Sequence, residues 1–288
     1  MKIGKRVRLR SLIFDIFAFV AIFILVQLVV SLIITKFVGG IFDANGKLTD
    51  FGFFATYFSA MVPILIIATR YESFRYGCST PIRSSWRGFD PTMALWGLIL
   101  LVSLTIAISP ITNMLPYTER TLPTGGWTLL TVCVIAPIFE ELIFRGRLYS
   151  MLCHSSSALL SAMLTAILFG VVHGDLRVMI SGFVAGLVFS YVYIQKSSII
   201  APILIHMFNN AIAYALVVLS YQNKSADEIV GESVDMSILY IVSLVISVIG
   251  MVHVVRTIRR KGVSAFPIAV EESAEVVDDP VVEEEASK

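Results

Sequence analysis

Charged residues are scarce in this sequence of 288 residues. Lysine, arginine, aspartate and glutamate make up 15% of the chain, whereas about a quarter is usual for a soluble domain. The hydrophobic share is 57%, and the mean hydropathy is +0.84. The few charges gather at both ends of the chain and in short interruptions between apolar runs. This composition excludes an ordinary soluble domain and indicates a helical protein that crosses a membrane several times.

Several chemical signals are also missing. The three cysteines, Cys78, Cys133 and Cys153, include no CxxC pair and show no zinc-site spacing, so we interpret them as free thiols without a special role. The net charge is only +1 and no basic face remains outside the loops, so nucleic acid is not an expected partner. The chain contains no internal repeat and no HExxH, the usual zinc-protease motif.

Apolar windows of about 20 residues predict eight transmembrane helices. We place them at Leu12–Val38, Phe51–Thr69, Thr92–Leu115, Trp127–Met151, Ser157–His173, Leu176–Ile194, Ser198–Ser220 and Met236–Val255. The first window is too long for the apolar part of a signal peptide, so we interpret it as a retained span. The predicted fold class is an all-α, polytopic membrane bundle. Its transmembrane domain covers residues 1–260, with a motif-bearing core over 127–220, and an acidic tail over 261–288 is expected to be disordered.

Lysines and arginines fall mostly on one side of the predicted bundle. That side holds the basic residues between Lys2 and Arg10, those between Arg256 and Lys261, and also Arg145 and Arg147. By the positive-inside rule, both termini are expected in the cytoplasm.

Three predicted spans carry polar side chains that are costly inside a bilayer and therefore suggest a functional site. The fourth span contains IAPIFEELIFRGRL (residues 135–148), the fifth ends in FGVVHG (169–174), and the seventh contains HMFNN (206–210). The residues of interest in these stretches are Glu140, Glu141 and Arg145, then Phe169 and His173, then His206 and Asn210.

Glu140 and Glu141 are expected to have different roles. Adjacent helical positions diverge by about 100°, so the two carboxylates cannot face the same way. Glu141 and Arg145 are four residues apart, share a face and can form a buried ion pair. Glu140 is then free to point into a cavity. Pro137, one turn earlier, removes a backbone hydrogen bond and can kink the helix beside both glutamates.

The three polar stretches can meet inside the bilayer. Counted from the nearest predicted turns, helical rise places Glu140, His173 and His206 roughly 21, 28 and 14 Å from one end of the bundle. Helix tilt blurs these depths by several ångströms and leaves the depth of His173 open. Such a set can perform general-base chemistry on water, with a histidine and an asparagine amide stabilising an oxyanion. The set of Glu140, His173 and His206 can also ligate a divalent metal such as zinc.

The three motifs together resemble those of the CPBP family of intramembrane proteases, which includes CAAX prenyl endopeptidases and bacteriocin-processing proteins of the ABI type. EELIFRG resembles the EExxxR motif of that family, FGVVH its FxxxH motif, and HMFNN its HxxxN motif. The resemblance implies an intramembrane endopeptidase with a fold of about eight spans. Carried over by position, it implies that Glu140 activates water with help from His173, that His206 and Asn210 form the oxyanion site, and that Glu141, Arg145 and Phe169 support the geometry.

The resemblance leaves the cofactor and the substrate open. Members of the family are commonly called metalloproteases, but one carboxylate with separated histidines makes a poor zinc shell, so we favour a reaction without a tightly bound metal. Expected partners are membrane lipids and a membrane-associated peptide or protein, of the prenylated CAAX type or bacteriocin-like. The expected location is a bacterial inner membrane.

Two other functions stay open at the level of sequence. Glutamates and histidines inside a membrane also relay protons in transporters, although the paired halves typical of transporters are not visible here. The other alternative is a catalytically inactive immunity or scaffold protein of the same fold. Such a lineage would be free to lose Glu140 or His173, and this chain has both.

Overall fold

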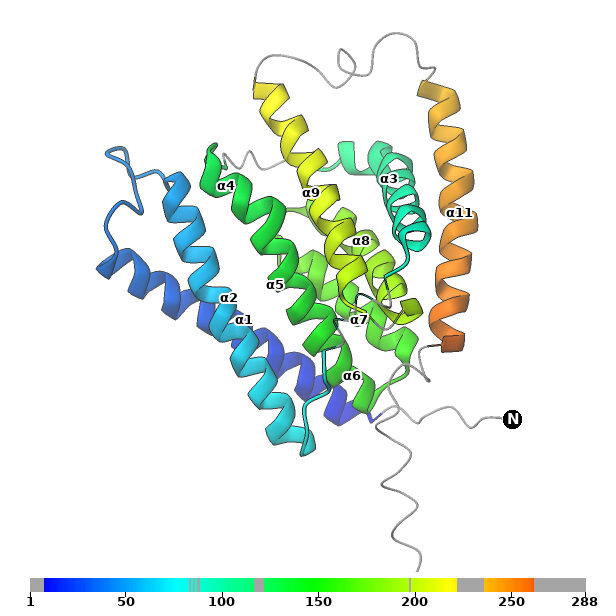
Figure 1. Cartoon of the computed structure of the whole chain (residues 1–288), viewed down its shortest axis with the longest axis horizontal. Coiled ribbons are helices and arrows are strands. Elements are labelled where there is room, and N and C mark those ends of the chain that lie inside the picture. Colours follow the sequence, from blue (N-terminus) through cyan, green and yellow to red (C-terminus); the bar gives the residue numbers. More distant parts are fainter. Residues whose placement is uncertain are drawn as a thin grey trace, which may run out of the picture.

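The chain forms a bundle of long helices in a computed structural model (Figure 1). The structure describes residues 8–82, 84, 86, 89–116, 122–196, 198–221 and 236–261. Its helices are α1 (Leu9–Phe37), α2 (Asp50–Tyr76), α3 (Pro91–Asn113), α4 (Gly126–Leu130), α5 (Ala136–Ile143), α6 (Tyr149–Ser155), α7 (Ala158–Val171), α8 (Leu176–Lys196), α9 (Ile200–Tyr221) and α11 (Met236–Lys261). Within these ranges the only β-type pairing is an isolated bridge between Phe42 and Leu48. The predicted all-α membrane bundle is confirmed.

Six helical stretches are long and apolar enough to cross a membrane. They are Leu9–Phe37, Asp50–Tyr76, Pro91–Asn113, Gly126–Ser155, Leu176–Gln195 and Ile238–Arg260, and two shorter apolar helices, Ala158–Val171 and Ile200–Leu216, accompany them. Each corresponds to one predicted span. The largest difference in bounds is at the end of α2, which continues to Tyr76 instead of ending at Thr69. Two charged residues of this extension, Glu72 and Arg75, pair with Arg147 and Asp15 inside the protein, so hydropathy alone ended the helix too early.

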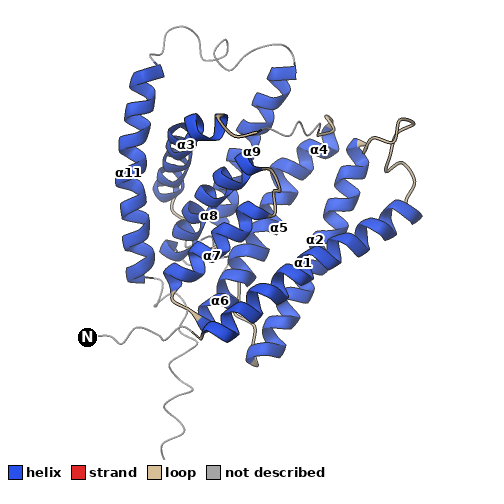
Figure 2. Cartoon of the chain, turned by 180° about the vertical axis from the view of Figure 1, so that it is seen from behind, coloured by secondary structure: helices blue, strands red, loops and turns tan. Residues whose placement is uncertain are grey.

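Burial decreases from the centre of the bundle to its edges. The apolar window of α8 is 61% buried, whereas those of α11 and α1 are 22% and 11% buried. In both views α1 and α11 lie at opposite sides, with α7 and α8 between them (Figures 1 and 2). The outer helices therefore expose apolar side chains to lipid, and α8 forms the centre on which the motif-bearing helices pack.

Small residues allow α7 and α8 to approach closely. A Cβ atom added to Gly182 would lie 3.1 Å from the Cα of Gly170, and one added to Gly186 would lie 2.8 Å from the Cα of Ala166. Gly182 and Gly186 are four residues apart in the GxxxG spacing that favours such contacts between membrane helices. This close packing brings the end of α7, which carries the FGVVHG motif, against the middle of the bundle.

The fourth of the long helical stretches, Gly126–Ser155, is one continuous helix that contains two π-helical turns, and we call it the fourth rod. The π-helical segments η2 (Thr131–Ile135) and η3 (Phe144–Leu148) flank α5 on both sides. In η2 the N–H of Ala136 donates to the carbonyl of Thr131, five residues earlier. The next carbonyl, that of Val132, would need the N–H of residue 137, and Pro137 has none. The EELIFRG motif thus lies between two π turns, a feature frequent at functional sites.

The first described helix begins, and the last one ends, at the same end of the bundle (Figure 1). At that end the N–H of Arg8 donates to the carbonyl of Ser155. Arg145 and Arg147, which the sequence analysis counted with the basic residues of this side, lie inside the fourth rod, and Arg145 is fully buried. They are therefore not loop residues, and the predicted orientation depends on the remaining lysines and arginines. Apart from Lys261, the predicted tail lies outside the described residues.

Candidate active site

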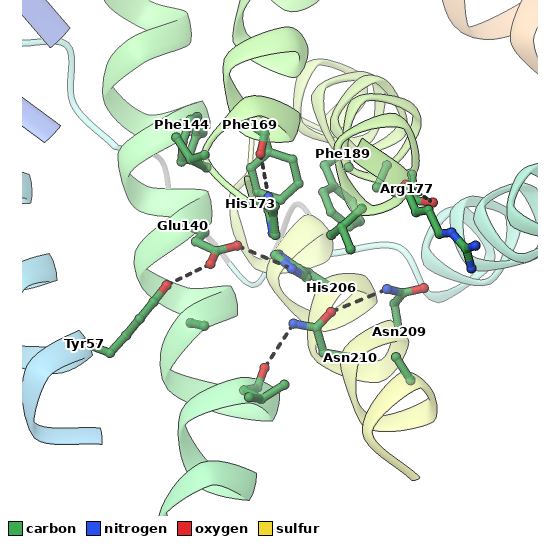
Figure 3. A pocket seen from close by; sticks show the side chains of 18 of the residues that line it. Tyr57, Glu140, Phe144, Phe169, His173, Arg177, Phe189, His206, Asn209 and Asn210 are labelled. Atoms are coloured by element: carbon green, nitrogen blue, oxygen red, sulfur yellow. Dashed lines mark hydrogen bonds and ion pairs between the residues drawn. The ribbon is translucent and has the colours of Figure 1, made fainter. Parts of the chain in front are cut away.

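A cavity of about 590 Å³ opens between the helices that carry the three motifs (Figure 3). Its wall contains Glu140, His173, His206 and Asn210, the four residues expected to be catalytic. Glu140 lies on α5, His173 in the turn after α7, and the other two on α9. The structure therefore brings the three motifs to one place, and His173, whose depth the sequence left open, faces the same cavity as the rest.

Glu140 is held by one carboxylate oxygen. Its Oε1 accepts a hydrogen bond from the hydroxyl of Tyr57 at 2.7 Å, and its Oε2 lies 3.7 Å from Nε2 of His206. The carboxylate thus lies between a tyrosine of α2 and a histidine of α9 (Figure 3). The second distance is too long for a direct hydrogen bond, so Oε2 can still bind a group that enters the cavity.

Glu141 points away from Glu140 and forms the expected pair with Arg145. Both side chains are fully buried, and Oε1 of Glu141 accepts from Nη1 of Arg145 at 2.8 Å. The same oxygen contacts Nδ1 of His206 at 3.0 Å. Arg145 also donates from Nη2 to the carbonyl of Gly186 at 3.0 Å. Glu141 therefore has two contacts, one with its counter-charge and one with the imidazole that faces Glu140.

Two aromatic rings enclose the guanidinium and the imidazole. The Arg145 guanidinium lies 4.5 Å from the ring centre of Phe169 and 5.1 Å from that of Phe189. His206 stacks on Phe189 at 4.8 Å and meets Phe169 edge to face at 5.7 Å. Cations are attracted to ring faces at such distances. Phe169, which the resemblance assigned to a supporting role, thus contacts both groups.

The hydrogen-bond partners of the two histidines define which ring nitrogens face the cavity. A carboxylate and a carbonyl oxygen can only accept, so the nitrogen opposite each must carry hydrogen. In His206 this nitrogen is Nδ1, beside Glu141, which leaves Nε2 towards Glu140. In His173 it is also Nδ1, 2.7 Å from the carbonyl of Phe169. Nε2 is therefore the nitrogen of each ring that can exchange a proton with a substrate or a water molecule.

Asn210 links α9 to the first π turn. Its Nδ2 donates to the carbonyl of Val132 at 3.0 Å, the carbonyl that Pro137 leaves without a helical donor. Asn209 donates to Oδ1 of Asn210 at 3.4 Å. These two contacts fix the orientation of the Asn210 amide. One N–H of this amide is used by Val132, and the other remains for a second acceptor.

Three groups of the site were not predicted from the sequence: Tyr57, Phe189 and the carbonyl of Val132. Tyr57 lies on α2 and Phe189 on α8, neither of which carries one of the three motifs. Aromatic residues are common throughout this chain, so no spacing separates these two from the rest. For Val132 the sequence does contain a weak indication, namely Pro137. A proline inside a membrane helix always leaves a backbone carbonyl that needs another hydrogen-bond donor.

The geometry does not fit the metal set considered from sequence. Among the described residues, no group of three His, Cys, Asp or Glu side chains comes together as a metal would require. Glu140 and His206 approach each other, but His173 does not join them in a three-ligand group. A zinc site needs three or four protein ligands at about 2 Å from the metal. Glu140, His173 and His206 therefore do not form a zinc site in this arrangement.

Comparison with known proteins supports the motif assignment. Residues 122–212 match the family described as type II CAAX prenyl endopeptidase Rce1-like. The chain is 27% identical over 82 residues to the "Putative membrane peptidase YdiL" of Bacillus subtilis (strain 168), which covers 28% of this chain and 34% of that protein. It is 29% identical over 96 residues to an "Uncharacterized 24.3 kDa protein" of Escherichia coli, which covers 32% of this chain and 44% of that protein.

Both alignments span less than half of the relative's own length. None of the solved structures matches this chain significantly. The matched segment begins before the fourth rod and ends just after HMFNN, so it contains all three motifs. The family resemblance inferred from the motifs is therefore confirmed over residues 122–212, the Rce1-like part of this multi-pass membrane protein.

Proposed function

We propose that this protein is an intramembrane endopeptidase that hydrolyses peptide bonds of membrane-associated substrates. The observation that carries the proposal is the position of Glu140, whose Oε2 faces Nε2 of His206 across 3.7 Å at the wall of a cavity inside a membrane bundle. The family match and the name of one relative favour the same class of enzyme.

In the proposed reaction, Glu140 is the general base. Its Oε2 takes a proton from a water molecule, and the water oxygen attacks the carbonyl carbon of the scissile bond. His173 assists through Nε2, because its Nδ1 is engaged by the carbonyl of Phe169. Protonated Glu140 then returns the proton to the nitrogen of the leaving peptide as the C–N bond breaks. One water molecule is consumed, and the products are a new carboxylate and a new amine.

The oxyanion of the tetrahedral intermediate would face His206 and Asn210. His206 donates from Nε2 when it carries both ring hydrogens, and the Glu141 carboxylate at Nδ1 is the counter-charge of that imidazolium. Asn210 offers the amide hydrogen that Val132 does not use. Donors held in place before the reaction stabilise developing charge without reorganisation. The attacked carbonyl thus fits between the water on Glu140 and these two donors.

The cavity lining favours a peptide with apolar side chains. Beside the polar groups, the wall includes Phe23, Phe53, Met61, Leu101 and Val178. We propose a prenylated CAAX-type or bacteriocin-like peptide as substrate class, reached from the bilayer or its surface. The excess of basic residues at the end where α1 begins supports a cytoplasmic position for both termini. A bacterial inner membrane remains the proposed location.

The direct test is cleavage by purified protein in lipid vesicles, with Glu140→Ala as the inactive variant. Wild-type protein is expected to release new peptide termini, detected by mass spectrometry, and the variant is expected to insert normally and release none. The same variant can trap uncleaved substrates from native membranes. Equal cleavage by both proteins would overturn the proposal. Proton uptake that depends on Glu140, without any cleavage, would identify a transporter instead.

Metal dependence is tested on the same preparation. Treatment with a chelator is expected to leave cleavage intact, because the described site shows no three-ligand shell. Full loss of activity that zinc restores would reject the metal-free reaction while leaving the peptidase function in place.

A further inference from the structure

An additional residue of the site comes from a helix without any of the motifs. Tyr57 on α2 lines the cavity, and its hydroxyl donates to Oε1 of Glu140 at 2.7 Å, although the two residues are 83 positions apart. Figure 3 shows the Tyr57 side chain meeting the carboxylate on the side opposite to His206. The two oxygens of Glu140 therefore have different surroundings.

This asymmetry matters because a glutamate side chain is flexible. Three side-chain torsions separate its carboxylate from the backbone, and the neighbouring cavity of about 590 Å³ leaves room for several orientations. A bond to Oε1 fixes the carboxylate plane and turns Oε2 towards His206. A reacting group that is misplaced by 1 Å can lose about 100-fold in rate. The rate of the proposed reaction is therefore expected to depend on how firmly the Glu140 carboxylate is oriented.

Tyr57 can do this because α2 is fastened to the rod that carries Glu140. Two turns before Tyr57, the carboxylate of Asp50 accepts the N–H groups of Trp127 at 3.0 Å and Thr128 at 2.6 Å. Directly after Tyr57, the ring of Phe58 packs edge to face on Phe139 at 5.7 Å. Contacts on both sides keep the hydroxyl at a constant distance from α5.

We propose that Tyr57 is a positioning residue that orients Glu140 for its reaction with water. The inference rests on the proposed peptidase function. Tyr57 acts through Glu140, since its hydroxyl contacts the oxygen that is turned away from His206.

The first test is Tyr57→Phe, which removes only the hydroxyl. We expect kcat to fall by about 10- to 100-fold while KM stays within about twofold, because the orientation of the base is lost and the cavity is retained. The matched control is Tyr71→Phe, which removes a hydroxyl from the same helix that also donates to a buried carboxylate, Asp15, at 3.1 Å. Both variants should lose similar thermal stability, and the control should keep the wild-type kcat. An unchanged kcat in Tyr57→Phe, or an equal loss in both variants, would overturn the inference.

A double-mutant cycle tests whether Tyr57 acts through Glu140. Glu140→Asp shortens the side chain by one methylene and withdraws the carboxylate from the hydroxyl. In this background, Tyr57→Phe is expected to change kcat by less than about twofold, since groups in contact are not additive. Fully additive losses would show that Tyr57 acts independently of Glu140.

Infrared spectra separate this inference from the proposed function. The difference between wild type and Glu140→Gln isolates the carboxylate stretch of Glu140 without any turnover. Tyr57→Phe should shift this band and Tyr71→Phe should not. If cleavage depends on Glu140 but neither the band nor kcat responds to Tyr57→Phe, the inference fails and the peptidase function stands. If no cleavage occurs, the peptidase function fails, and a shifted band still supports the positioning of Glu140 by Tyr57.

Discussion

Two acidic clusters are buried in this bundle, and they differ in how fully their carboxylates are used. The first is the candidate site around Glu140 and Glu141. The second, which we call the α1–α2–α6 cluster, is built around Asp15 and Glu72. Both of its carboxylates belong to fully buried residues, as does Glu141, but neither Asp15 nor Glu72 lines the site cavity.

The carboxylates of the α1–α2–α6 cluster are surrounded by donors. Glu72 accepts from Thr80 at 3.0 Å, Ser150 at 2.8 Å and Arg147 at 3.1 Å. Asp15 accepts from Tyr71 at 3.1 Å and also from Tyr76, and Arg75 lies 3.5 Å away. Buried charges that are paired and hydrogen-bonded in this way join helices together. This cluster therefore ties α1 and α2 to the fourth rod and leaves no oxygen for chemistry.

The site cluster is less complete. Oε2 of Glu141 has no hydrogen-bond partner in the described part of the chain, and Oε2 of Glu140 faces the cavity with His206 beyond direct bonding distance. Of these two clusters, therefore, only the site cluster has a carboxylate oxygen that faces the cavity and can bind another group. If burial were the only criterion for a functional acid, Glu72, which is fully buried, would be a better candidate than Glu140.

The largest expected effects come from exchanging the key acid of each cluster for its amide. Glu140→Gln should lower kcat by at least about 1,000-fold, because it removes the proposed general base, and should leave the melting temperature nearly unchanged. Glu72→Gln should do the reverse: it weakens the pairing with Arg147, so stability falls, while activity per folded molecule is retained. Thermal unfolding and turnover, measured on the same vesicles, compare the two variants. A large activity loss in Glu72→Gln at full stability would contradict the division between the clusters.

The next prediction compares the loss of stability on removing a buried arginine with that on removing a partly exposed one. Arg145→Ala leaves the fully buried Glu141 without its counter-charge and should cost about 3–5 kcal/mol, seen as low folded yield. Arg75→Ala removes a side chain that is 36% exposed and leaves Asp15 with its tyrosine donors, so less than about 1 kcal/mol is expected. Equal stability of the two variants would show that the Glu141–Arg145 pair does not support the fold.

A smaller effect on stability is expected from replacing Asn210, which lines the cavity and also donates to the backbone of η2. Asn210→Ala leaves the carbonyl of Val132 without a donor, which costs about 1–3 kcal/mol. Activity per folded molecule should fall by about 100-fold, because the proposed oxyanion donor is lost. Adding Pro137→Ala supplies a backbone N–H for Val132 and should recover stability without recovering activity. Recovery of both would mean that Asn210 only supports the helix.

The eight helices and the three motifs were accessible from sequence because long apolar runs and i,i+4 spacings are local features. Glu141 and Arg145 illustrate this best, since their pairing follows from helix geometry alone. Asp15 is a residue whose environment could not be predicted in this way. It lies inside the first predicted span, but no neighbouring residue in the sequence indicates its hydrogen-bond partners. Those partners come from α2 and α6, 56 to 140 residues away.

The sequence by itself determined that this chain is a bundle of membrane helices and which seven motif residues are the candidates for its site, because hydropathy and helical period act within one segment. Tertiary structure decided the rest. Only the packing of α2, α5, α7 and α9 places Tyr57, His173, His206 and Asn210 around Glu140, and only the cavity between those helices distinguishes Glu140 from the equally acidic Glu72. Contacts between distant helices depend on how the surfaces of whole helices fit together, and the spacing of residues within one segment does not predict that fit.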